Sequence, residues 1–470
     1  MESVWKKTVE LPHREKLEKS LHADAVVVGA GMAGALTAYL LQEQGMDVVV
    51  LEAGRMASGQ TGNTTAKITS QHGLIYAYLI EKFGREKAGM YAHANQHAIE
   101  AYAHIIEKEK INCQFQRCPA YLYTREEGRK VELEQEAEAA KSLGIPASFT
   151  LETELPFKVE GAVRFERQAK FHPLEFLKKV GGKLNIFEES RVVRLKDNCV
   201  YTEHGMVEGE HVVFACHYPW QVVPGYYFLR MHQERSYVSA LDISEWEPME
   251  GMYLGIGEEG LSFRTMEAEG SRILLLGGGS HRTGENSSGG KYRMLQKKGE
   301  EWFPGSREIA RWSAQDCMPM DKIPYIGYFS SEIPNWYVAT GFGKWGMSSS
   351  MAAASIISDM VLGREHVDEE VFAPQRFPIS ALSKNFTENA VQAVKGLSKQ
   401  AMSMEEFPGK CPHMGCKLEK NADDHTWECP CHGSCFTAEG ELVSGPAQHG
   451  LTADKDKADK SASISEIPEP

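Results

Sequence analysis

The sequence lacks any uninterrupted apolar stretch long enough to cross a lipid bilayer. The nearest to one, residues 25–41, is uncharged but short for a membrane span, and three glycines interrupt it. The amino-terminal segment, residues 1–24, also lacks the apolar core and the cleavage-site pattern of a secretory signal. We therefore expect a protein without a transmembrane segment that resides in the cytoplasm.

Basic charge is scarce relative to acidic charge. The chain has 51 Lys and Arg residues against 65 Asp and Glu residues, which gives a net charge of −14 at neutral pH. Nucleic acids and anionic lipid surfaces are bound through an excess of Lys and Arg, so this balance argues against both as partners. The 470 residues, 42% of them hydrophobic, suffice for two or three domains with sizeable cores.

Cysteine, by contrast, is concentrated in one place. Five of the ten cysteines fall within residues 411–436, together with three histidines. The others are scattered, as expected for reduced thiols in a cytosolic protein. These scattered cysteines are Cys113, Cys118, Cys199, Cys216 and Cys317. The crowded segment is therefore the candidate metal site of the chain.

A glycine motif near the amino terminus predicts a dinucleotide site. Residues 24–54 read as an apolar strand, the pattern Gly29-x-Gly31-x-x-Gly34, a helix and a second apolar strand that ends at Glu52. In such a unit Gly29 allows the tight turn, Gly31 lets a pyrophosphate approach the helix N-terminus, and Gly34 lets the helix pack closely on the strand. The Glu52 carboxylate would accept hydrogen bonds from ribose hydroxyls, and its charge disfavours a 2′-phosphate.

A second glycine motif, "GFGKWG", occurs much further along the chain, at residues 341–346. It follows a strand-like run at 335–340 and opens a helix-like run at 347–363, but no second strand with an acidic end follows. It is therefore half of a nucleotide site. One complete site and one half site fit a long dinucleotide held at both ends, which indicates FAD.

Residues 23–363 resemble the D-amino-acid oxidase and glycine oxidase family of FAD-dependent oxidoreductases. Besides the two glycine motifs, the likeness rests on "SGQTGNTTAK" (58–67), "FEESRVV" (187–193) and "DKIPYIG" (321–327). The resemblance implies an α/β Rossmann-like FAD-binding domain interleaved with an α+β substrate domain. It also implies the FAD contacts Gly29, Gly31, Gly34, Glu52, Thr64, Thr65, Lys67, Val192, Gly341, Gly343, Gly346 and Met347. In that family the segment of Thr64, Thr65 and Lys67 lies near the flavin, and the Val192 backbone meets the adenine.

A substrate-binding domain is predicted between the flavin segments, where a helical stretch at 86–110 and strand-like runs at 120–126 and 271–279 occur. An amino-acid oxidase needs a fixed cation to bind the substrate carboxylate. The candidates are Arg264, His281, Arg282 and Lys344. We predict Lys344 as the catalytic-site residue, because its motif lies against the flavin in the family that the chain resembles.

Cys317 leaves two interpretations open. Some sarcosine-oxidase relatives attach their flavin covalently through a cysteine just before the last flavin strand, whereas an ordinary buried thiol has no such role. The spacing from Cys317 to Asp321 fits the covalent pattern poorly. We therefore expect FAD to be bound without a covalent link to the protein.

The cysteine-rich segment contains two matching loops, "CPHMGC" at 411–416 and "CPCHGS" at 429–434. They resemble the Rieske [2Fe–2S] domain, in which two cysteines hold one iron and two histidines hold the other. The segment at 444–450 resembles the proline-containing loop that covers the cluster in that family. The resemblance implies the metal ligands Cys411, His413, Cys429 and His432, a disulfide between Cys416 and Cys431, and ligand histidines near the surface.

Two questions remain for this segment. Two cysteines and two histidines also form a legitimate tetrahedral zinc site, although zinc would not need Cys416 and Cys431 in addition. Cys435 lies outside the family pattern and is either a free thiol or a spurious ligand. We expect the iron–sulfur cluster, because the two loops together carry the whole pattern.

The two resemblances divide the chain into predicted parts. Residues 1–378 form the oxidoreductase domain, 379–404 a helical linker, 405–452 a small all-β Rieske domain and 453–470 a disordered, charged tail. The Rieske domain is minimal, because no strand pattern precedes its first loop. The linker is long enough to let the Rieske domain dock on the oxidoreductase domain, but its length does not enforce docking.

The two cofactors together predict a dehydrogenase. A flavin accepts a hydride from a substrate, whereas a [2Fe–2S] cluster carries single electrons. We expect oxidation of a small amine, amino acid or related metabolite, with electrons passing from FAD through the cluster to an external acceptor. A reductase fed by an external donor protein, or a redox sensor or electron-transfer protein without catalysis, would use the same residues. A Rieske oxygenase is disfavoured, because the chain has no downstream site of two histidines and one carboxylate.

Overall fold

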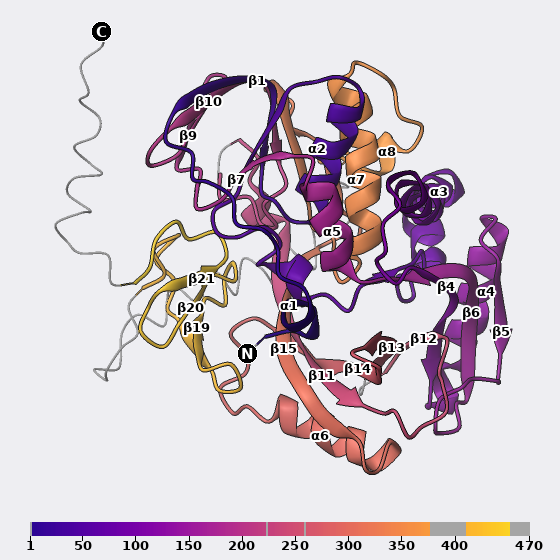
Figure 1. Ribbon diagram of the computed structural model, residues 1–470. Helices are drawn as coiled ribbons and strands as arrows, with labels where there is room; N and C mark the ends of the chain where they lie inside the picture. The colour runs from indigo at the N-terminus through magenta and orange to yellow at the C-terminus, as the bar shows by residue number, and fades with distance from the viewer. Residues whose placement is uncertain (1, 222–223, 258–259, 377–409, 452–470) are drawn as a thin grey trace, which may run out of the picture.

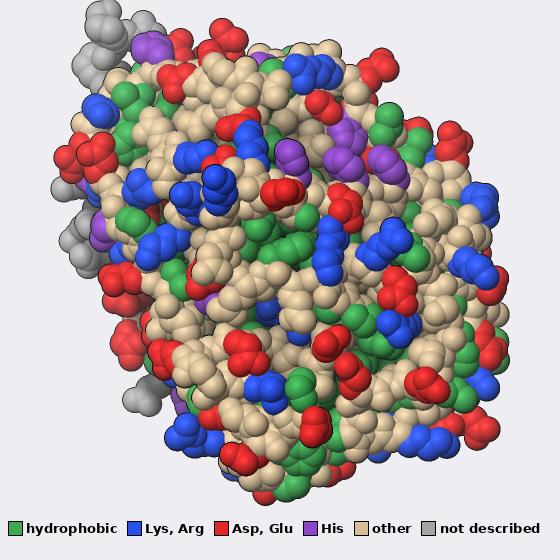
Figure 2. Space-filling view, turned by 45° about the vertical axis from the view of Figure 1, so that its right-hand side comes forward, with side chains coloured by type: hydrophobic (Ala, Val, Ile, Leu, Met, Phe, Trp, Pro, Cys, Tyr) green, Lys and Arg blue, Asp and Glu red, His purple; other side chains and the backbone are tan. Residues whose placement is uncertain are grey.

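Three β-sheets and the helices packed on them make up the molecule (Figure 1). The computed structural model describes residues 2–221, 224–257, 260–376 and 410–451. Within these ranges no helix combines the length and the apolar character that a membrane span requires. On the face drawn in Figure 2, acidic and basic side chains are intermingled over the surface.

The first sheet has eight strands and a parallel centre. Strand β1 pairs in parallel with β10 and with β2. Strand β10 also pairs in parallel with β17, and β2 pairs in parallel with β7. Strands β16 and β9 join the sheet in antiparallel orientation, and β8 pairs with β9. The bounds are β1 (Ser20–Val28), β2 (Val48–Leu51), β7 (Asn185–Phe187), β8 (Arg194–Lys196), β9 (Cys199–Tyr201), β10 (Met206–Phe214), β16 (Tyr325–Ser330) and β17 (Ile333–Thr340). All four residues of β2 are buried, as expected for a parallel strand covered on both faces.

Helix α2 (Met32–Glu43) connects β1 to β2, so the predicted strand–helix–strand unit is confirmed. It packs against α7 (Gly346–Val361) and α5 (Pro173–Gly181), as Figure 1 shows. Fully buried alanines such as Ala35 and Ala353 let the helix backbones approach closely. This packing brings the N-termini of α2 and α7, each preceded by a glycine motif, to the same part of the molecule. Two shorter helices are α1 (Val4–Thr8) and α8 (Glu369–Phe372).

The second sheet has nine strands and forms the predicted substrate domain. Its order is β15–β11–β14–β13–β12–β4–β6–β3, with β5 beside β6. The strands are β3 (Lys67–Ile68), β4 (Gln116–Thr124), β5 (Ala147–Thr150), β6 (Gly161–Lys170), β11 (Met231–Asp242), β12 (Met252–Gly255), β13 (Ser262–Ala268), β14 (Ser271–Arg282) and β15 (Arg307–Pro319). The associated helices are α3 (Tyr76–Glu109), α4 (Lys130–Ser142) and α6 (Lys291–Trp302). The predicted helix at 86–110 and strands at 120–126 and 271–279 overlap α3, β4 and β14, although α3 begins ten residues earlier and β4 four residues earlier than predicted.

The third sheet is small and antiparallel, as predicted for the carboxy-terminal domain. Its strands, in sheet order, are β18 (Glu419–Asn421), β19 (Thr426–Glu428), β20 (Cys435–Phe436) and β21 (Leu442–Ser444). Their core contains Leu418, Phe436 and Ala447 together with four buried cysteines. Within the described part of the chain, every strand of this sheet follows the first cysteine-histidine loop. The predicted linker at 379–404 and tail at 453–470 lie outside the described residues.

Candidate functional sites

A cavity of about 660 Å³ lies where the three sheets meet. Its wall includes the loop after β1, the end of β2, the start of β3 and the loop between β17 and α7. Every predicted FAD contact except Gly34 lines this cavity. The two glycine motifs therefore open on one continuous space, as the idea of a dinucleotide held at both ends requires.

The turn between β1 and α2 needs its glycines for steric reasons. Gly29 has a φ of +108°, and a Cβ there would lie 2.6 Å from the carbonyl oxygen of Ala215. A Cβ at Gly34 would overlap the carbonyl oxygen of Gly29, so Gly34 serves the packing of the helix and not the cavity wall. Gly31 differs, because a Cβ there would meet only the Thr61 hydroxyl, at 3.2 Å. A longer side chain at Gly31 would extend into the space that a pyrophosphate needs.

Glu52 is held rigidly at the end of β2. Its Oε2 accepts a hydrogen bond from the backbone N–H of Ala30, and its Oε1 accepts one from the N–H of Gly54, each at 2.8 Å. Burial raises the pKa of Glu52, although these two N–H groups and the Arg191 guanidinium oppose the shift. Each carboxylate oxygen can still accept a further hydrogen bond, which is the capacity that ribose hydroxyls require.

The second glycine motif forms a tight loop between β17 and α7. Gly341 and Gly343 have φ values of +71° and +55°, a region that favours glycine. The N–H of Gly343 donates to the Cys317 carbonyl, which ties the loop to β15. The N-cap residue of α7, Trp345, makes no side-chain capping hydrogen bond. The first N–H groups of α7 are therefore not capped by a side chain, as at the N-terminus of α2.

Of the four cations considered for substrate binding, only Lys344 lines the cavity. Its Nζ lies 3.0 Å from Glu234 Oε2 and donates to the Ser280 hydroxyl. A hydrogen bond from His232, followed by the charge of Lys344, lowers the pKa of Glu234 despite its burial. The positive charge of Lys344 is thus matched by a carboxylate of the protein itself.

The other three candidates are not part of the cavity wall. Arg264 donates to the carbonyl oxygens of Thr65 and Phe171, both at 2.7 Å. His281 is hydrogen-bonded to the Tyr237 hydroxyl at 3.1 Å, and Arg282 follows it on β14. Among the described residues that line the cavity, none of these three appears.

Two charged residues of the cavity wall were not predicted as substrate contacts. Lys67 at the start of β3 and Asp316 on β15 both line the cavity. Burial, and secondly the charge of Arg264, lower the pKa of Lys67 to about 7. Burial raises the pKa of Asp316 to about 7, and the charge of Lys344 opposes this shift. The sequence has no local signal that places Lys67 or Asp316 on the cavity wall, because their positions depend on contacts between distant strands.

The two cysteine-histidine loops form a second candidate site. The Cys411 and Cys429 thiols are both buried, and interaction with Cys429 lowers the pKa of Cys411 to about 6. The His413 and His432 rings lie 5.0 Å apart at 88°. The Nδ1 atoms of both histidines are buried without a hydrogen-bond partner in the described residues. Two facing thiols and two unsatisfied imidazole nitrogens are a donor set that suits an iron–sulfur cluster with mixed ligands.

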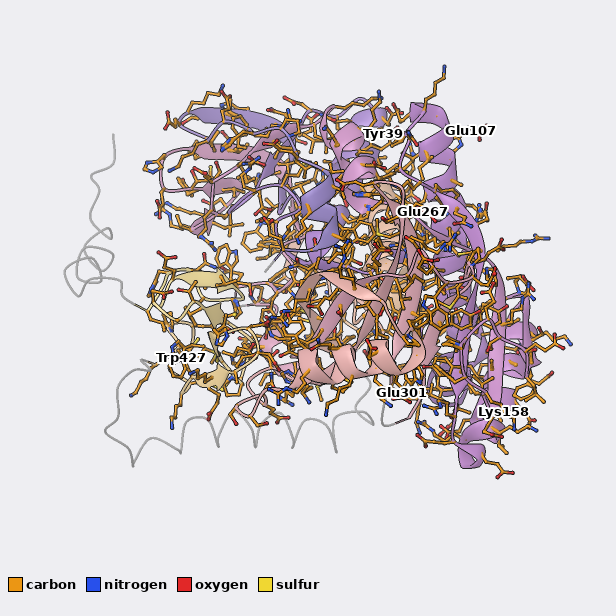
Figure 3. The ribbon with its side chains drawn as sticks, turned by 60° about the horizontal axis from the view of Figure 1, so that its bottom comes forward. Tyr39, Glu107, Lys158, Glu267, Glu301 and Trp427 are labelled. Atoms are coloured by element: carbon orange, nitrogen blue, oxygen red, sulfur yellow. A yellow bond between two sulfur atoms is a disulfide. The ribbon has the colours of Figure 1, made fainter. Side chains whose placement is uncertain are left out.

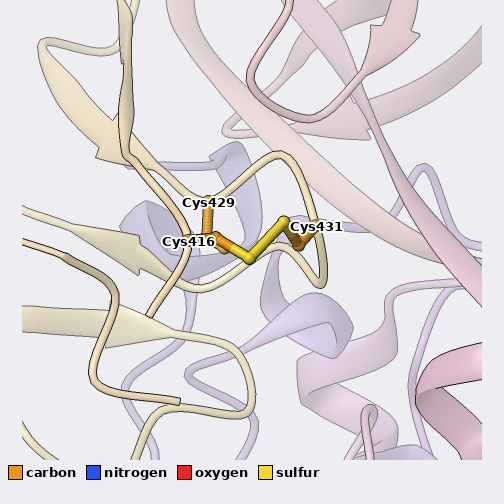
Figure 4. Close-up of side chains that lie close together, drawn as sticks. All are labelled: Cys416, Cys429 and Cys431. Carbon is orange, nitrogen blue, oxygen red and sulfur yellow. A yellow bond between two sulfur atoms is a disulfide. The ribbon is translucent and has the colours of Figure 1, made fainter. Parts of the chain in front are cut away.

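Burial also keeps these imidazoles in the neutral form that can bind metal. Burial lowers the pKa of His413 to about 4. Burial, and then the nearby His413 and Arg282, lower the pKa of His432 to about 3. Figure 4 shows Cys416 and Cys431 joined beside Cys429. The three sulfur atoms lie within 4.8 Å of one another, so the bridge braces the loops that carry the donor set.

Comparison with known proteins agrees with both sites. Residues 24–360 match the family of FAD dependent oxidoreductases (DAO), and residues 392–454 match the Rieske [2Fe-2S] domain. The chain is an FAD-dependent oxidoreductase of the DAO family. Its cofactors are FAD and a Rieske [2Fe–2S] cluster.

Relatives and solved structures support this assignment. The oxidoreductase is 34% identical to the putative Rieske 2Fe-2S iron-sulfur protein YhfW of Bacillus subtilis, over 95% of this chain and 96% of that protein. Its fold is similar to that of glycine oxidase from Geobacillus kaustophilus, with a TM-score of 0.64, 17% identity, and coverage of 76% of this chain and 100% of the other. It is also similar to L-proline dehydrogenase from P. horikoshii, with a TM-score of 0.62, 17% identity, and coverage of 78% and 98%.

One expectation about the oxidoreductase is wrong. His432 does not sit near the surface but is only 4% exposed, whereas His413 is partly exposed. The His432 ring faces Phe228 at 5.7 Å and Tyr218 at 6.4 Å between ring centroids. The difference arises because the Rieske domain packs with this loop against the rest of the oxidoreductase, which the sequence of the loop does not reveal.

Arg235 on β11 links the second sheet to the Rieske domain. Its Nε lies 2.6 Å from Glu428 Oε1, and its Nη1 lies 3.2 Å from Asp424 Oδ2. It also donates to Ser313 at 2.8 Å and to Gln315 at 2.9 Å. Arg235 and Glu428 are buried, at 7% and 0% exposure. A buried arginine paired with two carboxylates holds the Rieske domain in one place, which the linker length alone does not do.

Further polar contacts surround this ion pair. The Gln233 and Gln315 side chains donate to the backbone carbonyls of His432 and Gly433. A Cβ at Gly433 would overlap both glutamines, so the contact depends on a glycine in the ligand loop. Asp423 accepts a hydrogen bond at 2.9 Å from the N–H of Lys291, at the start of α6. Figure 3 shows the Rieske domain, marked by Trp427, against the body of the oxidoreductase.

The Rieske domain also closes part of the FAD cavity. Residues 442–445 of β21 and the loop after it, with Gln448, line this cavity. Tyr218 lines it as well, and its hydroxyl is buried without a hydrogen-bond partner in the described residues. Tyr218 therefore touches the FAD cavity and faces His432 with the same ring. Neither Tyr218 nor Arg235 was predicted, although a charged residue in the alternating strand pattern of β11 is a weak signal for a buried pair.

Proposed function

We propose that the protein is a dehydrogenase that oxidises a small amine, amino acid or related metabolite and passes electrons through the Rieske cluster to an external acceptor. The observation that carries this proposal is the shared position of Tyr218, which lines the FAD cavity and faces His432. Electron transfer between two cofactors requires close approach, and the docked Rieske domain supports it. Structural neighbours named as a glycine oxidase and an L-proline dehydrogenase support an amino acid as substrate.

The cofactor ligands in this proposal are those that the motifs predict. FAD supplies hydride acceptance and the cluster supplies one-electron transfer when both are bound. We infer that FAD is held by Gly29, Gly31, Glu52, Thr64, Thr65, Lys67, Val192, Gly341, Gly343, Gly346 and Met347, with Gly34 packing the helix of this site. We infer that Cys411, His413, Cys429 and His432 hold the cluster and that a Cys416–Cys431 disulfide braces them. The unpartnered Nδ1 atoms and facing thiols support the cluster ligands.

The roles of Lys344 and of the domains complete the proposal. We infer that Lys344 contacts the substrate while it stays paired with Glu234, because Lys344 lines the cavity. We also infer an oxidoreductase domain at 1–378 and a Rieske domain at 405–452. The Arg235 ion pair supports a Rieske domain that stays docked during turnover.

The proposal is tested by anaerobic mixing of the purified protein with a panel of amino acids and amines. Loss of flavin absorbance reports oxidation of the substrate, and the electron paramagnetic resonance signal of the reduced cluster reports transfer. We expect the cluster signal to follow flavin bleaching with at least one amino acid. A cluster that stays oxidised after the flavin has bleached would contradict the transfer, and bleaching by NADH alone would indicate a reductase.

A matched variant separates the two cofactors in this experiment. Cys429→Ser removes one proposed iron ligand and leaves the FAD cavity untouched, because Cys429 does not line it. Flavin bleaching by the same substrate should persist in this variant, while turnover with a one-electron acceptor should fall. Equal turnover in both proteins would mean that the cluster is not on the electron path.

A further inference from the structure

We propose that the α1 segment, residues 3–8, is a clamp that holds the loop of residues 58–65 in the conformation that binds FAD. Every residue of this loop except Gly62 lines the FAD cavity. Among the described residues that line the cavity, none belongs to the α1 segment. Figure 1 shows α1 next to β15, and α1 also contacts the loop. The segment therefore acts on FAD through the loop.

Two residues of the α1 segment bind backbone carbonyls of the loop. The Ser3 hydroxyl donates to the Gly62 carbonyl at 2.5 Å, and Trp5 Nε1 donates to the Thr64 carbonyl at 2.7 Å. The side chains of Ser3 and Trp5 are both buried. Water does not compete well for donors in a buried position, so these two hydrogen bonds fix the loop backbone at two points.

Lys6 binds the loop at two further points. Its Nζ donates to the Ser58 carbonyl at 2.9 Å and to Asn63 Oδ1 at 3.2 Å. The lysine side chain passes directly over Gly62, because a Cβ there would lie 2.6 Å from Lys6 Cε. Lys6 therefore connects the start of the loop to its centre, and Gly62 leaves room for it.

The second sheet holds the same loop. Trp312 Nε1 on β15 donates to the Asn63 carbonyl at 2.8 Å, and Arg264 on β13 donates to the Thr65 carbonyl at 2.7 Å. The Arg264 guanidinium also lies 5.0 Å from the centre of the Trp5 ring. Together with the α1 segment, these side chains bind four consecutive carbonyls of the loop. The α1 segment and the sheet thus fix its backbone jointly.

The loop depends on such contacts because it has little regular structure of its own. Every residue of the loop is described, and it contains a 3₁₀ turn at Gln60–Asn63 but no α-helix and no strand. It also meets the N-terminus of α2, where Thr61 Oγ1 accepts a hydrogen bond from the Met32 N–H at 2.9 Å. A loop that is competent for only a fraction of the time raises the apparent dissociation constant of FAD by the inverse of that fraction. A loop ordered in advance avoids this loss.

The test measures FAD release from the loaded, full-length protein after dilution, through the fluorescence of free FAD. Lys6→Met removes both contacts of the ammonium group with the loop and should accelerate release about tenfold, because charge-assisted hydrogen bonds are lost. Lys7→Met is the matched control, since the neighbouring Lys7 donates to the Ile309 carbonyl on β15 and not to the loop. It should release FAD at the rate of the wild type.

A second variant tests the buried part of the clamp. Trp5→Phe keeps an aromatic ring beside Arg264 and loses the indole N–H that binds the Thr64 carbonyl. It should release FAD roughly threefold to tenfold faster than the wild type. The iron content of all three variants should equal that of the wild type, because the clamp and the loop lie outside the Rieske domain.

Hydrogen exchange in the protein after FAD removal distinguishes a clamp on the loop from a general loss of stability. The amides of residues 58–65 should exchange faster in Lys6→Met than in Lys7→Met, whereas those of helix α4 should exchange at the same rate in both. A purely structural role of Lys6 would speed exchange in both places.

Two results would overturn the proposal. One is an equal rate of FAD release from Lys6→Met and Lys7→Met. The other is faster release from Lys6→Met with unchanged exchange in the loop, because the effect would then arise elsewhere. These measurements need neither a substrate nor an electron acceptor, so they stand whichever reaction the flavin performs.

Discussion

The residues of the FAD site are spread over a far longer part of the chain than the proposed ligands of the cluster site. The residues of the FAD cavity come from all three sheets and range from Val28 to Gln448. The proposed cluster ligands come from two loops between Cys411 and His432. A site drawn from short loops is visible in the sequence as a compact pattern. A site drawn from distant segments is visible only in part, through the motifs that bind the most regular portion of the cofactor.

The two sites also differ in how their charges are balanced. The contact around the cluster buries Arg235 with two carboxylates, so the protein neutralises its own charge there. In the FAD cavity, no acidic side chain among the described residues forms an ion pair with Lys67, and burial lowers its pKa to about 7. A self-neutralised contact suits permanent docking, whereas an unmatched charge suits a group that enters and leaves. Four substitutions test this difference, and their expected effects decrease from the first to the last.

Cys429→Ser should abolish the cluster. A serine oxygen replaces a buried thiolate, so the iron content should fall from about two atoms per chain to nearly none, while FAD content stays the same. Elemental analysis and flavin absorbance measure the two quantities. Cys435→Ser is the matched control, because this buried thiol lies outside the proposed ligand set, and it should retain iron. Retention of the full iron content by Cys429→Ser would contradict the ligand assignment.

Gly31→Val should give the reverse pattern, with FAD lost and iron retained. The valine side chain would occupy the space for the pyrophosphate, yet the backbone at Gly31 has a φ of −77° that valine can adopt. Flavin absorbance and iron analysis on the same sample measure the outcome. Gly89→Val on α3 is the control, since a Cβ there meets nothing within 4 Å. Stoichiometric FAD in Gly31→Val would refute the site.

Arg235→Met should destabilise the docked structure by about 3–5 kcal/mol. The methionine removes the positive charge that pairs with Glu428 and Asp424. Both carboxylates then lose the compensation that these ion pairs provide. Denaturant unfolding of the loaded protein measures the change. The control is Arg307→Met, which removes an exposed arginine near Asp242 and should cost less than about 1 kcal/mol. Equal losses in the two variants would show that the buried pair is not special.

Tyr218→Leu should have the smallest effect, a slower reduction of the cluster after the flavin is reduced. The leucine removes the aromatic ring that faces His432 from a residue of the cavity wall, without changing the proposed ligands of either cofactor. Rapid mixing with the substrate found in the panel measures the rate. Tyr218→Phe keeps the ring and should behave as the wild type, because the hydroxyl makes no hydrogen bond in the described residues. A similar slowing in both variants would point to the hydroxyl instead.

Much of the fold and of the cofactor chemistry could be predicted from local patterns. The glycines around Gly31 and the apolar runs beside them identify a βαβ unit, because turn geometry and strand burial are local requirements. The same is true of the cysteine-histidine loops. The exposure of His432 was predicted wrongly, because burial depends on what packs against a loop. Lys344 was favoured as the catalytic-site residue from its motif, but its ion pair with Glu234 on a distant strand could not be read from the sequence.

The two cofactors and the order of the domains follow from local sequence patterns, because metal ligands and phosphate-binding turns require particular residues at short spacings. How the two sites lie relative to one another became visible in the folded molecule. The fold placed β21 of the Rieske domain on the wall of the FAD cavity, Tyr218 beside His432, and Arg235 between two carboxylates. It also left Lys67 without an acidic partner in the part of the chain that the structure describes. These relations depend on contacts between residues that are far apart in the chain, and such contacts arise only when the sheets pack together.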